Sequence, residues 1–298
     1  MPSIKKQTNH SSIKEKKMKT IRSIFVLSIL GLLIGACSDS DDTVPQGENP
    51  LEGLHLLESI QANGHTLEIY SKKEAFVTGY NELFLRIKDQ QGYVPHAELS
   101  WNPVMHMASM VHSCPKSAIT TTGVDTLYQG YIIFQMPGNA DEYWELSLHY
   151  GYGGALYELS QRIQVREPLD GKRTVNVFTG SDQARYVLAM LPLDPKVAIN
   201  DISALLFKME NMMEFPALVN HSITLDPRMP GMGNHSSPNN VDLAYDAAKE
   251  MYTGKLSLTM TGYWRLNLKL LNPQDQVLKG EDLTEEIQES SLFFELEF

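Results

Sequence analysis

The sequence predicts an all-β protein built from two tandem β-sandwiches, and three observations lead to this prediction. Apolar and polar residues alternate with a period of two along many short segments, turn residues separate these segments, and a long pattern occurs twice. Such alternation is typical of strands that bury one face. Many short strands of this kind indicate sandwiches of the immunoglobulin type.

The alternation is clearest in segments 66–70, 82–88, 143–149, 174–178, 255–260 and 264–270. Turn pairs such as Asn63-Gly64, Pro137-Gly138 and Asp170-Gly171 lie between the apolar runs. No long amphipathic helix is expected, although Val241 to Met251 allows one or two helical turns.

The repeated pattern begins with a stretch rich in Met and His, at residues 105–115 and again at 229–238. Each stretch is followed by the same downstream signature, at matching spacing except for four extra residues, Asn139 to Glu142, in the first copy. The first copy reads Tyr128-x-Gly130, Met136-x-Gly138 and Tyr143-Trp144, and the second reads Tyr252-x-Gly254, Met260-x-Gly262 and Tyr263-Trp264. Repetition over the length of a domain indicates tandem domains and excludes a solenoid of short repeats.

The N-terminal part of the sequence predicts export and lipidation. Residues 1–36 have a basic beginning and a short apolar run, as a signal peptide does, and the run is too short for a spanning helix. Ile34 to Cys37 resembles a bacterial lipobox, which implies a lipid on Cys37. Residues 37–52 form an acidic linker that resembles the run after the lipidated Cys of exported Bacteroidetes lipoproteins.

Length and charge set the domain organisation and exclude some partners. We expect domains at residues 53–168 and 169–298, with a boundary near 167–171, because each segment is long enough for its own core. The chain has a net charge of −11, and removal of the basic leader leaves an even more acidic protein. An acidic surface argues against binding to nucleic acid.

The order of these motifs resembles the YtkA-like family of exported β-sandwich domains. The shared features are a Met/His loop after a strand, then Tyr-x-Gly, Met-x-Gly and Tyr-Trp-x-Leu. The second copy is more similar, with Met229-Pro230-Gly231-Met232, whereas the first carries Met105-His106-Met107 and extra residues before Trp144. Such domains are discussed beside periplasmic copper-handling proteins, so the resemblance implies metal binding.

The chemistry of the Met/His stretches independently favours a soft metal. Thioethers are neutral, soft donors that suit Cu(I), and imidazole binds either oxidation state of copper. The candidate ligands are Met105, His106, Met107, Met110, His112 and Cys114 in the first stretch and Met229, Met232 and His235 in the second. The competing interpretation is that these methionines only fill gaps in a core.

Other notable residues are interpreted as structural. Met209, Met212 and Met213 are expected to pack in the core or at an edge. Trp144, Trp264, Met136 and Met260 lie in strand patterns, which indicates core positions.

The sequence predicts a binding protein and not an enzyme, since it lacks a nucleophile elbow, a zinc-protease motif, a phosphate loop and a dinucleotide fingerprint. The favoured function is a lipid-anchored carrier or buffer of Cu(I) on the periplasmic face or the cell surface, working with a copper-handling partner. The alternative is a metal-free interaction module at the cell envelope, and catalysis comes third.

Overall fold

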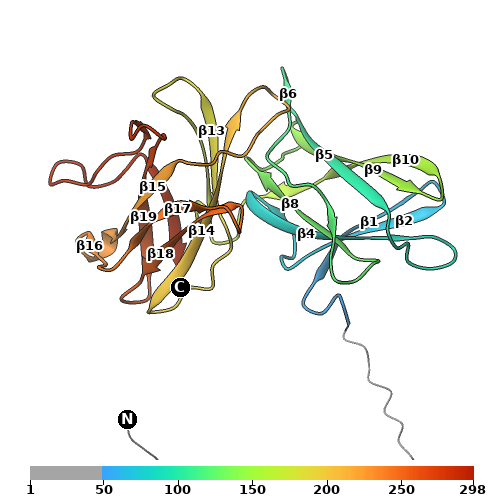
Figure 1. Cartoon of the computed structure of the whole chain (residues 1–298), viewed down its shortest axis with the longest axis horizontal. Coiled ribbons are helices and arrows are strands. Elements are labelled where there is room, and N and C mark those ends of the chain that lie inside the picture. Colours follow the sequence, from blue (N-terminus) through green and yellow to red (C-terminus); the bar gives the residue numbers. More distant parts are fainter. Residues whose placement is uncertain (1–48) are drawn as a thin grey trace, which may run out of the picture. The chain divides into compact units, whose positions relative to one another are not determined.

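The computed structural model describes residues 49–298, and Glu48–Phe298 form one compact unit. The described part consists of strands, turns and one short 3₁₀ helix, η1 (Pro230–Met232), with no α-helix (Figure 1). The all-β prediction is therefore confirmed. The predicted signal peptide, Cys37 and most of the linker lie outside the described residues.

Two antiparallel sheets of the first half pack on each other around a common core. The first has the strand order β1 (His55–Ala62), β2 (His65–Ser71), β4 (Gly79–Lys88), β8 (Tyr128–Phe134) and β7 (Thr120–Thr121). The second has the order β10 (Ala155–Ile163), β9 (Tyr143–Tyr152), β5 (Glu98–His106) and β6 (Val111–His112). A small parallel pair joins β3 (Phe76–Val77) to β11 (Val165–Arg166).

Strict alternation explains why these segments form strands. Along β4, buried residues alternate with partly exposed ones from Gly79 to Ile87, so one face of the strand enters the core. Leu83 and Leu85 of β4 belong to the same buried cluster as Trp144 and Leu146 of β9. A single core thus lies between the two sheets, which is the arrangement of a β-sandwich.

The second half contains one continuous ten-stranded sheet. Its main order is β12 (Val175–Thr179), β13 (Arg185–Met190), β14 (Ile199–Met209), β18 (Met251–Ser257), β17 (Val241–Asp246), β15 (Ser222–Met229), β19 (Tyr263–Leu271) and β20 (Val277–Lys279). In addition, β16 (His235–Ser236) pairs with β15, and β21 (Leu292–Glu297) pairs with β19.

Strand β17 connects the two flanks of this sheet. It pairs with β18 through Tyr245 and with β15 through Leu243, and its register is irregular between Val241 and Ala244. Such irregularities let a strand bend from one sheet layer to another. The helical turns expected for Val241 to Met251 are therefore a wrong prediction, because pairing on both sides holds Val241–Asp246 extended.

A third buried cluster contains side chains from both halves. Ile133 of β8 packs with Val187 and Ala189 of β13 and with Leu205 and Phe207 of β14. These strands are buried on both faces, because their alternate residues also enter the separate cores of the two halves. Two-sided burial explains why their sequences are continuous apolar runs with little alternation.

The repeat extends to individual hydrogen bonds around a buried tyrosine. The Tyr128 hydroxyl donates to the carbonyl of Val94 over 2.9 Å and accepts from the Ala97 N–H over 2.7 Å. The Tyr252 hydroxyl donates to the carbonyl of Leu218 over 2.9 Å and accepts from the His221 N–H over 3.3 Å. Tyr128 therefore ties β8 to the segment that precedes β5, and Tyr252 ties β18 to the segment that precedes β15.

A buried asparagine is repeated in the same way. The side-chain amide of Asn81 donates hydrogen bonds to the carbonyls of Val77 and Gly79. Its side-chain oxygen accepts a hydrogen bond of 3.0 Å from the Val77 N–H. Asn200 makes the equivalent three bonds, including one of 2.9 Å from the Lys196 N–H. These side chains satisfy backbone groups that would otherwise be unpaired where β4 and β14 begin.

We expect Tyr128→Phe and Tyr252→Phe each to lower the free energy of unfolding by about 1–3 kcal/mol, because each leaves buried or partly buried backbone groups without a partner. Urea unfolding of residues 48–298 provides the measurement. Tyr157→Phe and Tyr245→Phe are the matched controls, since neither hydroxyl has a hydrogen bond within residues 49–298. Equal losses in all four variants would contradict a specific role for the two buried hydroxyls.

Candidate functional site

The first Met/His stretch folds into a β-hairpin. Met105 and His106 at the end of β5 pair with His112 and Val111 of β6, respectively. The turn is closed by a 2.9 Å hydrogen bond from the Met107 N–H to the carbonyl of Met110. The second stretch forms the corresponding hairpin, in which β15 and β16 pair across the turn that contains η1.

The pleat of β5 separates Met105 from His106. Met105 is fully buried in the first core. His106 lies on the opposite face, where its ring stacks on Tyr143 with 4.8 Å between centroids and its Nε2 is 3.7 Å from Glu145 Oε1. Successive residues of a strand point to opposite faces, so these two candidate ligands do not converge.

Met107, Met110 and His112 line one cavity of about 320 Å³ together with three methionines from elsewhere in the chain. Met136 follows β8, and Met209 and Met212 come from the end of β14 and the turn after it. The remaining lining residues are Gln135, Val177, Arg185, Tyr186 and Val187.

One backbone hydrogen bond joins the two sides of this cavity, which we call the Met pocket. The Ser113 N–H donates to the carbonyl of Met212 over 2.8 Å, next to His112. On the other side, Trp144 Nε1 donates to the carbonyl of Met136 over 2.9 Å. The backbone on both sides of the thioethers is thus fixed by hydrogen bonds. Met110 and Met212, with side chains 46% and 42% exposed, open the Met pocket to solvent.

One ring nitrogen of His112 is held by the backbone. Its Nδ1 lies 2.7 Å from the Ser113 carbonyl, and only an N–H at this nitrogen can make that bond. Nε2 then carries the free lone pair, which is the usual arrangement for a metal-binding histidine with a backbone acceptor behind it. The ring is buried and packs edge-on against Trp144 with 5.6 Å between centroids.

The second hairpin does not gather its candidate ligands in this way. Met229 is 5% exposed in the second core, and its Cε lies 3.1 Å from the point where a Cβ on Gly262 would be. Met232 is 59% exposed on η1, and His235 is also exposed. One donor therefore faces the core while the other two face solvent.

Sequence reasoning missed Met136, Met209 and Met212 as members of a binding site. Met209-x-x-Met212-Met213 is about as rich in methionine as the first hairpin, and this density is a sequence signal from which Met209 and Met212 could have been found. Within residues 49–298, no group of three His, Cys, Asp or Glu side chains is arranged to hold a metal ion. The described candidate site is therefore built mainly from thioethers.

No protein-family model and no curated protein matches this sequence. Among solved structures, the chain is similar to a DUF4785 family protein from Legionella pneumophila, with a TM-score of 0.25, 10% identity, and coverage of 73% of this chain and 56% of that one. It is also similar to an endo-fucoidan hydrolase of glycoside hydrolase family 107, with a TM-score of 0.19, 9% identity, and coverage of 73% and 35%. The chain thus spans about half or less of each of these proteins, and at such TM-scores neither carries an argument about function.

Cys114 lies beside the hairpin but is 1% exposed, and burial raises the pKa of its thiol. Because the thiolate is the reactive form, we expect no modification of Cys114 by a thiol reagent in folded protein at pH 8 and full modification in urea. Iodoacetamide labelling of residues 48–298 measures this, since Cys114 is the sole cysteine of that fragment. Rapid labelling of the folded form would show that the thiol is accessible to solvent and to metal ions.

Proposed function

We propose that this protein binds Cu(I) in the Met pocket and carries or buffers the ion outside the cytoplasm. The observation that supports the proposal is that five methionines and His112 line a single cavity. Thioethers suit Cu(I) and bind zinc and hard cations poorly. An imidazole with its Nε2 lone pair available adds a stronger donor to this set.

The Met pocket is open to solvent, so an ion can reach the thioethers from outside. Met107 and Met136 pack against the first core, whereas Met110 and Met212 are exposed at the mouth of the pocket. About 320 Å³ of space lies along these residues. Arg185 also lines the Met pocket, but it is exposed and therefore solvated, so its charge is screened from a bound monovalent cation.

The proposal places the protein at the cell envelope. A lipid on Cys37 would hold it at the membrane, and the segment up to residue 52 would act as a tether. Among the described residues, no helix has the length and apolarity needed to cross a membrane. A copper-handling partner would receive the ion, and the protein itself would carry out no reaction.

The proposal also treats the two halves as tandem immunoglobulin-like domains. Its support is the repeated set of hydrogen bonds around Tyr128 and Tyr252 and around Asn81 and Asn200. Each half also has a separate buried core.

A competition titration of residues 48–298 with Cu(I) should find one strong site. Met107→Leu with Met110→Leu, and Met209→Leu with Met212→Leu, should each weaken it about tenfold or more while changing stability by less than about 1.5 kcal/mol, because Leu preserves apolarity and approximate size. A loss of stability with unchanged copper uptake would show that these residues only pack.

Met229→Leu with Met232→Leu is the matched control, because these residues lie outside the Met pocket. This variant should keep the strong site. A second Cu(I) equivalent that disappears in this variant would assign a further site to Met229, Met232 and His235. Copper uptake by the wild type no greater than by lysozyme under the same reducing conditions would leave the metal-free interaction module as the function.

The lipid anchor predicts that wild-type protein partitions with membranes of a bacterial host and incorporates a palmitate analogue. Cys37→Ala should abolish the label and leave the protein soluble or unprocessed, because the acceptor thiol is gone. Cys114→Ser, which removes the other cysteine, should keep the label. An unlabelled wild-type protein would exclude lipidation at Cys37.

A further inference from the structure

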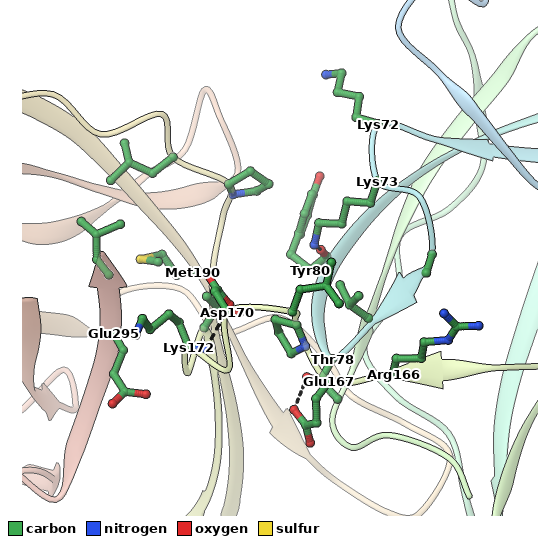
Figure 2. Close-up of a pocket in the computed structure, with 18 of the residues that line it drawn as sticks. Lys72, Lys73, Thr78, Tyr80, Arg166, Glu167, Asp170, Lys172, Met190 and Glu295 are labelled. Carbon is green, nitrogen blue, oxygen red and sulfur yellow. Dashed lines mark hydrogen bonds between the residues drawn. The ribbon is translucent and has the colours of Figure 1, made fainter. Parts of the chain in front are cut away.

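A second cavity, of about 710 Å³, lies away from the Met pocket and shares none of its lining residues. Its walls come from segments 72–80, 166–174, 190–193 and 295–297, with His55 in addition. Figure 2 shows Lys73 and Tyr80 on one side of this cavity and Met190 on the other. A cavity of this volume is in the range of small-molecule sites.

Most charged groups of this cavity already have partners. Lys72 pairs with Glu82 over 2.9 Å, and Lys172 pairs with Glu297. The Thr78 hydroxyl donates to Glu167 over 3.0 Å, as the dashed line in Figure 2 shows.

Two further charged groups of the lining are also satisfied. Glu295 accepts a hydrogen bond from the Tyr263 hydroxyl, and Arg166 donates to Gln164 from an exposed position. Three carboxylates of the lining without a cationic partner within residues 49–298, Glu74, Glu167 and Asp170, are exposed, so water stabilises their charge.

Lys73 differs from all these groups. Its ammonium donates one hydrogen bond of 2.7 Å, to the carbonyl of Tyr80, and no carboxylate of residues 49–298 lies within ion-pair distance. Two of its three N–H donors therefore remain for a ligand. Burial lowers the pKa of Lys73 to about 8, while Asp170 acts in the opposite direction. An ammonium in such surroundings is stabilised by an added anion.

Part of the wall opposite Lys73 is apolar. This part consists of Met190 at the end of β13 and of Leu191, Pro192 and Leu193, which follow it. Lys172 and Glu295 lie on the same side (Figure 2). Leu169, on the connection between the two halves, is fully exposed at the edge of the cavity. A molecule that covered Leu169 would remove an apolar side chain from water, which is favourable.

We propose that this cavity binds a small monoanionic carboxylate with an apolar body, and that Lys73 is its counter-ion. The carboxylate accepts the two free N–H donors of Lys73, and the apolar body contacts Met190, Leu193 and Leu169. A phosphate dianion fits less well, because the carboxylates of Glu74 and Asp170 repel two negative charges more strongly than one.

Octanoate is the probe, and calorimetric titration of residues 48–298 at pH 7 measures its binding. Lys73→Met should weaken octanoate binding about tenfold or more, since a charge-assisted contact is lost. Lys72→Met, at the neighbouring ion-paired position, should change it less than about twofold. Octan-1-ol and octylamine should bind at least about tenfold more weakly than octanoate, because neither presents a carboxylate.

The pH dependence tests the same contact without a variant. A bound carboxylate raises the pKa of Lys73, so binding takes up a proton above about pH 8 and not at pH 6.5. Affinity should then fall as the pH rises from 8 to 10. Calorimetric titrations in two buffers of different ionisation enthalpy measure how many protons are taken up on binding. Absence of octanoate binding, equal binding by Lys73→Met, equal binding of octan-1-ol, or no proton uptake at pH 8.5 would each overturn the proposal, whatever the result of the copper titration.

Discussion

The packing of five apolar side chains between the two halves is the contact on which both candidate sites depend. Ile133, Val187, Ala189, Leu205 and Phe207 are all buried in this shared cluster. Burying a large aliphatic or aromatic side chain contributes about 1.5–3 kcal/mol, so together these contacts are substantial against the marginal stability of a domain. The Met pocket and the Lys73 cavity are both lined by residues of the two halves, and each therefore depends on how the halves pack together.

Sequence patterns predicted the strands well where one face is buried and less well elsewhere. The alternation along β4 and β9 corresponds directly to their burial. The runs Tyr131–Phe134 and Ala204–Phe207 lack alternation because both faces are buried, and periodicity alone does not distinguish such runs from buried helices. The short segment at Val241 was misread as helical for a related reason, since its conformation is set by the strands on either side.

The candidate site was predictable only as far as its residues are close in sequence. Met107, Met110 and His112 lie in one hairpin, so their proximity follows from a short turn. Their approach to Met209 and Met212 depends on how the halves pack, which no local pattern encodes. Met105 and His106 were grouped with them because they are adjacent, yet the pleat of a strand directs adjacent side chains to opposite faces.

The difference between the two hairpins shows why a repeated sequence need not produce a repeated site. In the first copy, the turn faces the end of β14, and the methionines there complete the wall of a cavity. In the second copy, Pro230 and Gly233 shape a 3₁₀ turn, with Gly233 in the left-handed region at φ = 64°, and Met232 on that turn stays exposed. The described chain supplies no further methionine-rich segment to cover it. The repeat thus provides the candidate donors twice, whereas the cavity around the first set comes from the contact between the halves.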